Sequence, residues 1–540
     1  MSARVIDTAI AEAVCGYPAR NFCALIYFGQ RQGIRVAAFS LLRRIATVMA
    51  LAGSLAAHAQ GQSVLRIGLQ DDPDSFDPAR AYSFVGRIIL TSLCNKLVDT
   101  APDLSFVPQL ALSWTTAPDG KAVTFKLRPG VKFSDGTDMD AAAVAFNIDR
   151  GLHLPGSRRS SEISAVDTVD VLDPLTVRFN LKAPFASLIA QLSDRAGLIA
   201  SPKALQNPAG FDAAPACSGP FKLRERVSLD RVVLVRDPTY WDHEHFHFDR
   251  VEFRIMSDPT IRLSNLRAGT LDFAERILAS DVQMLKTDTR LRVIVGPSLR
   301  YTGITFNIAN GTGASPEFSK SAQLREALDL SFERAAINQV VFDGNGVPGN
   351  QPVVFTSPYY APNRPVMPPD IAKARTLIQA SGIAHPTLDL MVQNSADQVQ
   401  VGQMLQSMAK DTGIAINLQA IEFQTQLARQ ASGSFQASLI GWGGRVDPDG
   451  NISPLLGCKS STNDGRYCGG AEADLLAGQA ETDPARRREL YQRAISTILD
   501  DRPIIYLYHP PLIMGMTARL NGFVYHPDGL IRLRDVAYAP

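Results

Sequence analysis

Apolar and polar residues alternate with a period of two in some segments of the chain and with a helical period in others. Alternation at 64–69 and 387–392 predicts strands, whereas apolar spacings of three and four residues at 321–342 and 371–381 predict helices. Residues 122–150 combine a strand, a Pro-Gly turn, a short strand, an Asp-Gly turn and a helix. Because strands and helices follow one another along the chain, an α/β fold is expected.

The segment 437–451, ASLIGWGGRVDPDGN, reads as a buried strand that runs into an irregular, polar, glycine-bearing loop. Glycines on both sides of Trp442 allow the backbone to approach a bound molecule, and an indole offers a flat wall with one donor. Ligands of α/β folds bind beyond the carboxyl ends of strands, where this loop would lie. A core tryptophan followed by a surface turn is the alternative interpretation.

Length and charge limit the class of protein. A chain of 540 residues is too long for a single core, so two or three domains are expected. Lys and Arg number 54 and Asp and Glu number 53, so the net charge is +1. Such a balance leaves no large excess of positive charge with which to bind nucleic acid.

The N-terminal region has the pattern of a secretory signal. Arg43 and Arg44 precede an apolar run at 45–57 that ends in the small-residue pattern Ala57-His58-Ala59. The run is shorter than the roughly 18 apolar residues of a spanning helix. We therefore predict a cleaved signal peptide at 35–59, an unexplained extension at 1–34, and a soluble protein exported to the periplasm.

Four cysteines remain after this cleavage, and export places them in an oxidising compartment. Cys458 and Cys468 bracket a polar, turn-rich loop, so a disulfide between them is expected. Cys94 and Cys217 then pair by elimination, with two buried free thiols as the alternative.

Two charged segments invite a metal hypothesis. The acidic turn at 71–78 lacks calcium-ligand spacing and contains two prolines, so a solvated turn is favoured. The histidines His243, His245 and His247 would share one side of an extended segment and could bind a transition metal such as nickel. A solvated connector is the favoured interpretation of this run.

Catalytic motifs are missing from the chain. It contains no GxSxG, no HExxH and no P-loop, and the formal GxGxxG at 344–349 follows a helix instead of a strand. An α/β chain without a catalytic constellation favours a binding protein without enzymatic activity or cofactor. An exported hydrolase or transferase, a nickel or metal-chelate carrier, and a chaperone-like peptide binder are the alternatives.

Several motifs, in order along the chain, resemble family 5 extracellular solute-binding proteins of ABC importers, the dipeptide, oligopeptide and nickel binding type. These motifs are FKLRPGVKFSDGTDMDAAAVAFNIDR at 125–150, SGPFKL at 218–223, DPTYW at 237–241, RLSNLRAGTLDFA at 262–274, LREALDLSFERAAI at 324–337 and GWGGRVDPDGN at 441–451. The resemblance implies a type II, cluster C-like fold in which two lobes close on a peptide or peptide-like solute. It also implies a monomer that delivers this solute to an inner-membrane permease driven by an ATPase.

The same resemblance implies a domain organisation. Lobe one would comprise 60–296 and 511–540, with an extra subdomain at about 108–215, and lobe two would comprise 297–510. The ligand-binding candidates carried over from the family are Tyr82, Ser83, Phe84, Ser218, Gly219, Tyr301, Thr302, Phe355, Thr356, Trp442, Arg445 and Asp447.

Arg445 departs from the family pattern. In similar dipeptide binders an aspartate at this place pairs with the ammonium group of the ligand, whereas an arginine suits a carboxylate or phosphate. We therefore expect a ligand with an anionic group at this end. Two alternatives remain: Asp447 or Asp449 takes over the ammonium, or Arg445 only forms a salt bridge to one of these aspartates.

Overall fold

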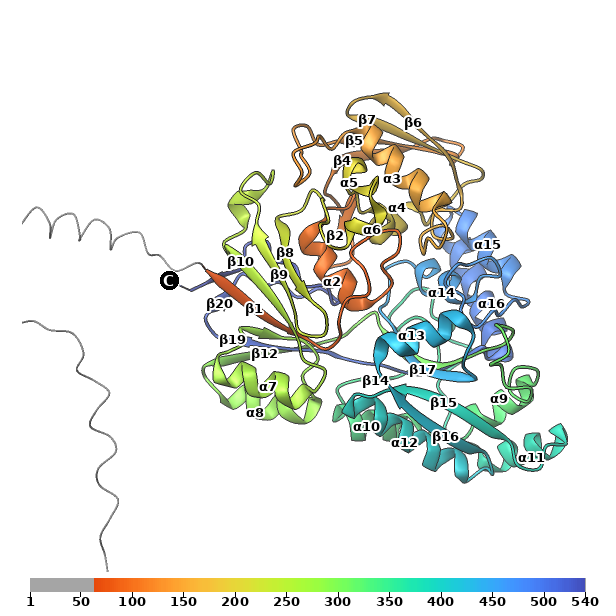
Figure 1. The fold of residues 1–540 in the computed structure, drawn as a ribbon. Helices are drawn as coiled ribbons and strands as arrows, with labels where there is room; N and C mark the ends of the chain where they lie inside the picture. The colour runs from red at the N-terminus through yellow and green to blue at the C-terminus, as the bar shows by residue number, and fades with distance from the viewer. Residues whose placement is uncertain (1–62, 540) are drawn as a thin grey trace, which may run out of the picture. The chain divides into compact units, whose positions relative to one another are not determined.

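The computed structural model describes residues 63–539, which form one compact unit. The predicted signal peptide and N-terminal extension lie outside the described residues. Two large mixed sheets dominate this unit, and a third, smaller sheet accompanies them (Figure 1). None of the helices within 63–539 combines the length and the apolar character that a membrane crossing requires.

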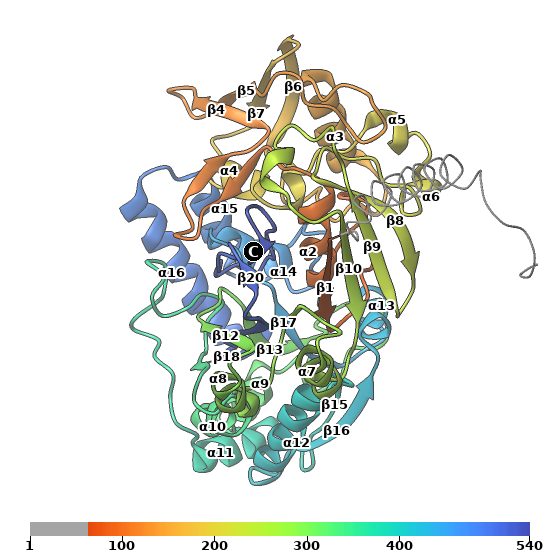
Figure 2. The same cartoon turned by 90° about the vertical axis from the view of Figure 1, so that its left-hand side faces the viewer.

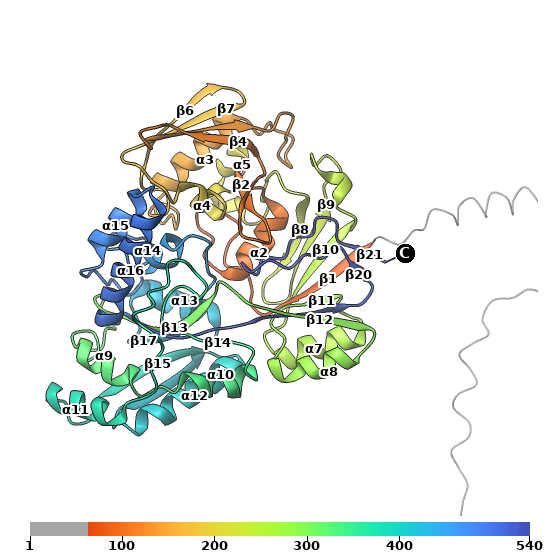
Figure 3. The same ribbon diagram turned by 180° about the vertical axis from the view of Figure 1, so that it is seen from behind.

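The first large sheet has seven strands. β1 pairs in parallel with β10 and β11, and the remaining pairs are antiparallel. Its order is β12 (Leu291–Gly296), β19 (Leu512–Thr517), β11 (Phe273–Ala274), β1 (Val64–Leu69), β10 (Arg250–Ile255), β9 (Arg231–Arg236) and β8 (Phe221–Val227). Helices α7 (Pro259–Ala268) and α8 (Val282–Thr287) pack at its β11, β12 and β19 side, as Figure 3 shows.

The second large sheet has six strands. β15 pairs in parallel with β16 and β17, whereas β13 is antiparallel to both β17 and β18. Its order is β14 (Val347–Pro348), β18 (Ile504–His509), β13 (Tyr301–Phe306), β17 (Ala437–Trp442), β15 (Thr387–Gln393) and β16 (Ala415–Ile421). Helix α12 (Ala396–Lys410) packs on β15 and β16 (Figure 2), and α10 (Arg334–Phe342), α11 (Ile371–Ser381), α13 (Phe423–Ser432) and α16 (Pro484–Asp501) complete this part.

The chain passes between the two large sheets twice. It leaves β12 at Gly296 and enters β13 at Tyr301, and it returns from β18 at His509 to β19 at Leu512. We call the parts built on the seven-stranded and the six-stranded sheets the first and the second lobe. Each has its own buried apolar core, which is what makes it a separate packing unit.

A four-stranded antiparallel sheet forms a smaller body on the first lobe. Its order is β4 (Ala111–Thr116), β5 (Ala122–Leu127), β7 (Thr176–Leu181) and β6 (Val166–Asp173), and α3 (Ala141–His153) packs on β6 and β7. Phe125 and Phe179 meet edge to face in its core, with ring centroids 5.0 Å apart. The expected strand, turns and helix of 122–150 all lie in this body.

Disulfide bonds join Cys94 to Cys217 and Cys458 to Cys468. The first links the residue after α2 (Phe84–Leu93) to the segment before β8. The second closes the loop that follows α14 (Asp449–Leu456).

The expected single helix at 321–342 is wrong. The segment forms two helices, α9 (Ala322–Asp329) and α10, because the chain turns at Leu330 and Ser331. The Ser331 hydroxyl donates back to the Leu328 carbonyl, and the Glu333 carboxylate caps α10 by accepting from the Ala335 amide. Likewise, the loop after Trp442 is shorter than expected, because α14 begins at Asp449.

The acidic turn at 71–78 is buried, which corrects the expectation of a solvated turn. Asp72 pairs with Arg226 at 3.4 Å, and Asp77 pairs with Arg150 at 2.5 Å. Asp74 accepts hydrogen bonds from the backbone of Tyr82 and Ser83. Each of these carboxylates therefore has a partner inside the fold, as burial of a polar group requires.

Candidate functional site

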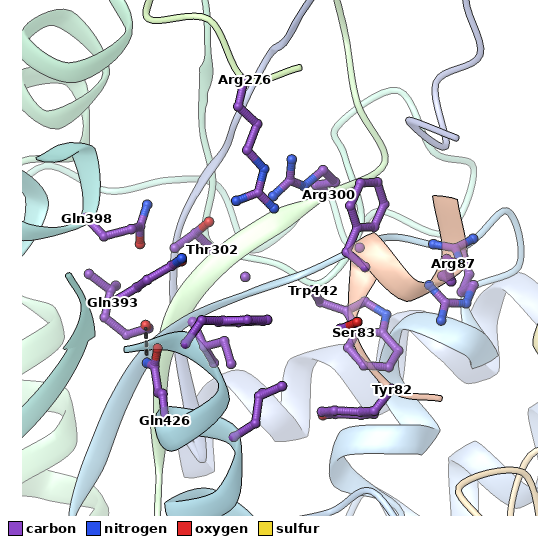
Figure 4. Close-up of a pocket in the computed structure, with 18 of the residues that line it drawn as sticks. Tyr82, Ser83, Arg87, Arg276, Arg300, Thr302, Gln393, Gln398, Gln426 and Trp442 are labelled. Atoms are coloured by element: carbon purple, nitrogen blue, oxygen red, sulfur yellow. Dashed lines mark hydrogen bonds between the residues drawn. The ribbon is translucent and has the colours of Figure 1, made fainter. Parts of the chain in front are cut away.

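A cavity lies between the two lobes, at the ends of β13 and β17 and beside the start of α2 (Figure 4). Trp442 and Tyr82 form part of its wall, with ring centroids 6.4 Å apart. The Trp442 indole N–H donates to the Gly450 carbonyl at 3.0 Å, which fixes the orientation of the ring. Aromatic walls with a few convergent polar groups are typical of small-molecule sites.

The start of α2 presents Tyr82, Ser83 and Phe84 to this cavity. Ser83 caps the helix by accepting from the Gly86 amide, and its hydroxyl donates to Asp74 at 2.5 Å. Asp74 also accepts from the Tyr82 amide at 2.6 Å. The buried acidic turn therefore holds this edge of the cavity in place.

Two glycines let the loop after Trp442 approach the first lobe and the crossing segment between Gly296 and Tyr301. A Cβ atom on Gly443 would lie 2.8 Å from the Phe84 ring, and one on Gly444 would lie 2.3 Å from the Leu299 carbonyl oxygen. Gly444 also has a φ of 72°, in the left-handed region that favours glycine. A larger residue at either position would push the loop away from the cavity.

Arg445 follows these glycines and reaches across to the first lobe. Its Nε lies 2.6 Å from Asp194 Oδ2, and its guanidinium carbon lies 4.8 Å from the centre of the Trp442 ring. Arg87 Nη2 contacts the same Asp194 oxygen at 2.7 Å. Asp194 is thus shared by arginines from both lobes, and Arg195 lies 3.6 Å from its other oxygen.

Burial governs the electrostatics of this cluster. Burial, together with the nearby charge of Arg87, lowers the pKa of Arg445 to about 9. Although burial by itself raises the pKa of Asp194, the charges of Arg445, Arg87 and Arg195 hold that pKa well below its ordinary value. Arg445 and Asp194 are therefore both charged at neutral pH.

A second pair of arginines, Arg276 and Arg300, lies side by side in the cavity (Figure 4). Arg276 faces Asp71 at 3.7 Å. Arg300 has no carboxylate partner within residues 63–539, and its buried Nε has no hydrogen-bond partner there. Burial, reinforced by the charge of Arg276, lowers the pKa of Arg300 to about 9, so the group is still charged at neutral pH although its burial is unfavourable.

Five arginines line the cavity in all, namely Arg87, Arg195, Arg276, Arg300 and Arg445. The remaining polar lining is neutral and comprises Ser83, Thr302, Gln393, Gln398 and Gln426. Of the described residues that line this cavity, none is an aspartate or a glutamate. The cavity is therefore suited to an anion.

A second cavity adjoins the first and shares Arg276, Arg300, Thr302 and Gln398 with it. Its other walls are largely apolar, and Asp397, at the start of α12, is a carboxylate in its lining. The second cavity thus adds a single carboxylate, Asp397, beside arginines that include Arg262, Arg276 and Arg300.

Polar contacts bridge the lobes around these cavities. The Gln393 side-chain amide donates to Asp71 at 2.5 Å, and the Gln424 amide donates to the Asp72 carbonyl at 2.8 Å. On the smaller body, Gln191 donates to Asp449 at 3.0 Å. The described conformation is a closed one, in which the lobes touch on both sides of the cavity.

The structure brings six of the twelve candidate residues to the main cavity, namely Tyr82, Ser83, Phe84, Thr302, Trp442 and Arg445. Tyr301 lies behind Trp442, where it lines a smaller cavity and its hydroxyl donates to the Asn451 carbonyl at 3.2 Å. Arg445 forms its salt bridge with Asp194 and not with Asp447 or Asp449.

The other five candidates lie away from this cavity. The Gly219 amide donates to the Leu93 carbonyl, and a Cβ there would clash with that backbone, so Ser218 and Gly219 pack against the end of α2. Phe355 is 62% exposed, and Thr356 beside it is exposed as well. Both oxygens of Asp447 accept from Arg487 at 2.8 Å, which keeps this carboxylate in a structural ion pair.

Most of the lining arginines and all three glutamines are absent from the sequence-based candidates. Arg87, Arg195, Arg276 and Arg300 belong to four separate segments of the chain, and no local motif marks them. A basic residue inside an apolar helix, as in FVGRIIL at 84–90, was the available signal for Arg87.

The histidine run does not form an extended segment. Residues His243–His245 form a short 3-10 helix, in which His243 contacts the Tyr240 carbonyl and His245 pairs with Asp535 at 2.6 Å. Within residues 63–539, no group of three or more His, Cys, Asp or Glu side chains is arranged to hold a metal ion.

Two lobes that enclose a buried, aromatic and arginine-lined cavity define a two-lobed solute-binding protein. Residues 105–463 match the family model described as "Bacterial extracellular solute-binding proteins, family 5 Middle". The chain belongs to this family, whose members serve ABC importers.

Similar proteins agree with this assignment. The chain is 28% identical over 485 residues to the glutathione-binding protein GsiB of Pectobacterium atrosepticum, covering 85% of this chain and 91% of the relative. The periplasmic binding protein DppA of Helicobacter pylori, solved with the peptide STSA, superposes with a TM-score of 0.81 at 21% identity, covering 89% of this chain and 99% of the other. A dipeptide-binding protein of Pseudoalteromonas sp. SM9913, solved with Met-Leu, gives a TM-score of 0.80 at 23% identity, covering 88% and 100%. These likenesses show a two-lobed periplasmic binding protein fold.

Proposed function

We propose that this protein captures a small, anionic, peptide-like solute between its two lobes and delivers it to a membrane permease. The observation that carries the proposal is the cavity lining, in which five arginines and no aspartate or glutamate of the described residues take part. Guanidinium groups bind carboxylates in a forked geometry, and buried ones need such a partner. The peptide ligands of the structural neighbours and the glutathione-binding relatives support a peptide-like solute.

Binding in this proposal is a population shift between an open and a closed arrangement of the lobes. Arg445 and Gln393 belong to the second lobe, whereas Arg87 and Asp71 belong to the first. A solute that contacts arginines of both lobes favours the closed state because only that state offers all the contacts at once. Trp442, Tyr82 and Phe84 supply the apolar contact area.

We further propose lobe boundaries that follow the two crossings, with lobe one at 60–296 and 511–540 and lobe two at 297–510. The smaller body, at about 108–215, is a subdomain of lobe one. Export through a signal peptide at 35–59 fits the charged and apolar pattern there, and a monomer without enzymatic activity or cofactor, working with a permease and its ATPase, fits the family.

The proposal is tested by binding measurements on protein purified from the periplasm. The set of candidate solutes comprises glutathione, the acidic dipeptide Ala-Glu, the neutral dipeptide Ala-Ala and the basic dipeptide Lys-Lys. Acidic members are expected to raise the melting temperature most, because a ligand at a hundred times its dissociation constant adds about 2.7 kcal/mol to stability. Stronger stabilisation by Lys-Lys or Ala-Ala than by both acidic compounds would contradict the proposal.

A further inference from the structure

We propose that the solute is a dianion. Its two acidic groups occupy two separate arginine centres, and it places no ammonium group in the arginine-lined cavity. N-acylated amino acids and N-acylated short peptides with two carboxylates have this chemistry. The inference rests on the proposed function and narrows it to a class of solute.

The first centre is the cluster around Asp194. Arg87, Arg195 and Arg445 surround this one carboxylate at distances between 2.6 and 3.6 Å. Three guanidinium groups share a single negative charge. Arg87 Nη1 and Nε are buried without a hydrogen-bond partner in the described residues, so protein acceptors do not saturate this guanidinium group.

The second centre is the pair Arg276 and Arg300. Arg276 faces Asp71 at 3.7 Å, whereas Arg300 has no carboxylate in salt-bridge contact and no hydrogen-bond partner for its buried Nε within 63–539. The Phe84 ring lies near both centres, with its centroid 5.8 Å from the Arg87 guanidinium carbon and 5.0 Å from that of Arg300. Asp194 belongs to the first centre and Asp71 faces the second, so the two centres are built on different carboxylates.

The arginines of the cavity outnumber the carboxylates in contact with them. Two carboxylates, Asp194 and Asp71, pair with four of the five arginines that line the cavity, and Arg300 has no such pair in the described residues. Positive charge therefore exceeds the contacting negative charge in a buried region, where uncompensated charge is costly. A dianion would reduce this excess.

An amine finds no charged acceptor in this cavity. Both nearby aspartates are engaged, since Asp194 contacts arginines and Asp71 accepts from Gln393 and faces Arg276. An ammonium would meet only neutral oxygens of Ser83, Thr302 and the glutamines, and it would be repelled by the excess arginine charge. Asp397 lies in the adjoining cavity and offers the competing location for an amine.

Three matched compounds test the inference by isothermal titration calorimetry at pH 7: N-acetyl-Ala-Glu, Ala-Glu and N-acetyl-Ala-Gln. The first keeps two carboxylates without an amine, the second adds the amine, and the third removes one carboxylate. N-acetyl-Ala-Glu is expected to bind at least about tenfold more tightly than either of the others, because a tenfold change corresponds to one modest charged contact. Equal or tighter binding of Ala-Glu or of N-acetyl-Ala-Gln would overturn the inference, as would a lack of binding by all three at 10 mM.

The variant Arg300→Gln tests whether the second acidic group of the solute binds at the pair Arg276 and Arg300. It should reduce the ratio of affinities for N-acetyl-Ala-Glu and N-acetyl-Ala-Gln to near one, whereas Arg290→Gln, at an exposed arginine of the first lobe, should leave the ratio unchanged. An unchanged ratio in Arg300→Gln would also overturn the inference. If Ala-Glu binds more tightly and Asp397→Asn removes that advantage, the amine lies at Asp397. The proposed function then survives although this inference fails, whereas a preference for Lys-Lys contradicts both.

Discussion

Asp194 Oδ2 lies 2.6 Å from Arg445 Nε and 2.7 Å from Arg87 Nη2, so one carboxylate of the first lobe joins arginines from both lobes. The contact lies in the wall of the cavity, next to Trp442. It couples closure of the lobes to the charge of the site, because the Arg445 contact exists only when the lobes meet.

Replacement of Asp194 by Asn should leave the surrounding arginines without their shared counter-charge. Removal of one partner from a buried ion pair typically costs about 3 to 5 kcal/mol, and denaturant unfolding of Asp194→Asn should show a loss of that order. Asp474→Asn, which removes the carboxylate from an exposed pair with Arg493, is the control and should have no measurable effect. Equal stability of the two variants would show that Asp194 is dispensable.

The contribution of Asp194 to the free energy of unfolding should also depend on pH. Its pKa in the folded protein lies well below the ordinary value of about 4, so the folded state favours the ionised form. The stability that it contributes is complete above pH 4 and is lost as the pH falls toward the folded pKa. The difference in unfolding free energy between the unaltered protein and Asp194→Asn should therefore shrink below pH 4, and a difference that grows on acidification would contradict this account.

The contribution of Asp71 to the free energy of unfolding should change with pH in the opposite direction. Burial raises its pKa to about 6, despite the opposing charge of Arg276, so the folded state binds this proton more tightly than the unfolded chain does. Between pH 4 and pH 6 the unaltered protein should lose stability relative to Asp71→Asn as the pH rises, by about 1 to 3 kcal/mol. Paired unfolding curves at pH 4, 5, 6 and 7 measure this difference, and a constant difference would rule out the raised pKa.

Arg300 should behave unlike the arginines around Asp194. Its charge has no carboxylate partner in the described residues, so Arg300→Gln should keep or increase the stability of the ligand-free protein. The same change should weaken binding of an acidic solute by about 1.5 to 3 kcal/mol, the value of a charged hydrogen bond. A loss of stability without a loss of affinity would identify Arg300 as a purely structural residue.

Trp442 combines a structural and a binding role. It is 7% exposed, and it packs with Tyr82 and donates to the Gly450 carbonyl. Trp442→Ala is expected to cost about 3 to 5 kcal/mol of stability, so it does not isolate binding. Trp442→Phe keeps a ring in the wall and is the sharper variant, because it should lose less stability than Trp442→Ala while it still weakens binding. Unchanged affinity would remove Trp442 from the site.

Local patterns predicted much of the fold. The strand at 64–69 and the helix at 371–381 have the predicted bounds, because each is short, strongly periodic and flanked by breakers. The helix expected at 321–342 is interrupted by a turn, which the Ser331 hydroxyl and the Glu333 carboxylate stabilise by hydrogen bonds to the backbone. Such side-chain hydrogen bonds compete with a continuous helix only when the tertiary structure favours them.

The candidate site was only partly predictable. The loop around Trp442 and Arg445 carries its own sequence signal, and similarity to the family indicated Tyr82, Ser83 and Phe84. Arg276 and Arg300 come together only through the arrangement of the lobes, so no spacing along the chain reports their proximity. Burial of the acidic turn was missed for the same reason, since its partners Arg150 and Arg226 are more than 70 residues away.

The most direct test is a crystal structure of the protein with its solute bound. The account predicts an acidic group of the solute within about 3.2 Å of the guanidinium nitrogens of Arg300 or Arg445, in the cavity walled by Trp442. A cationic group of the solute at these arginines, or a solute bound outside the gap between the lobes, would contradict the account.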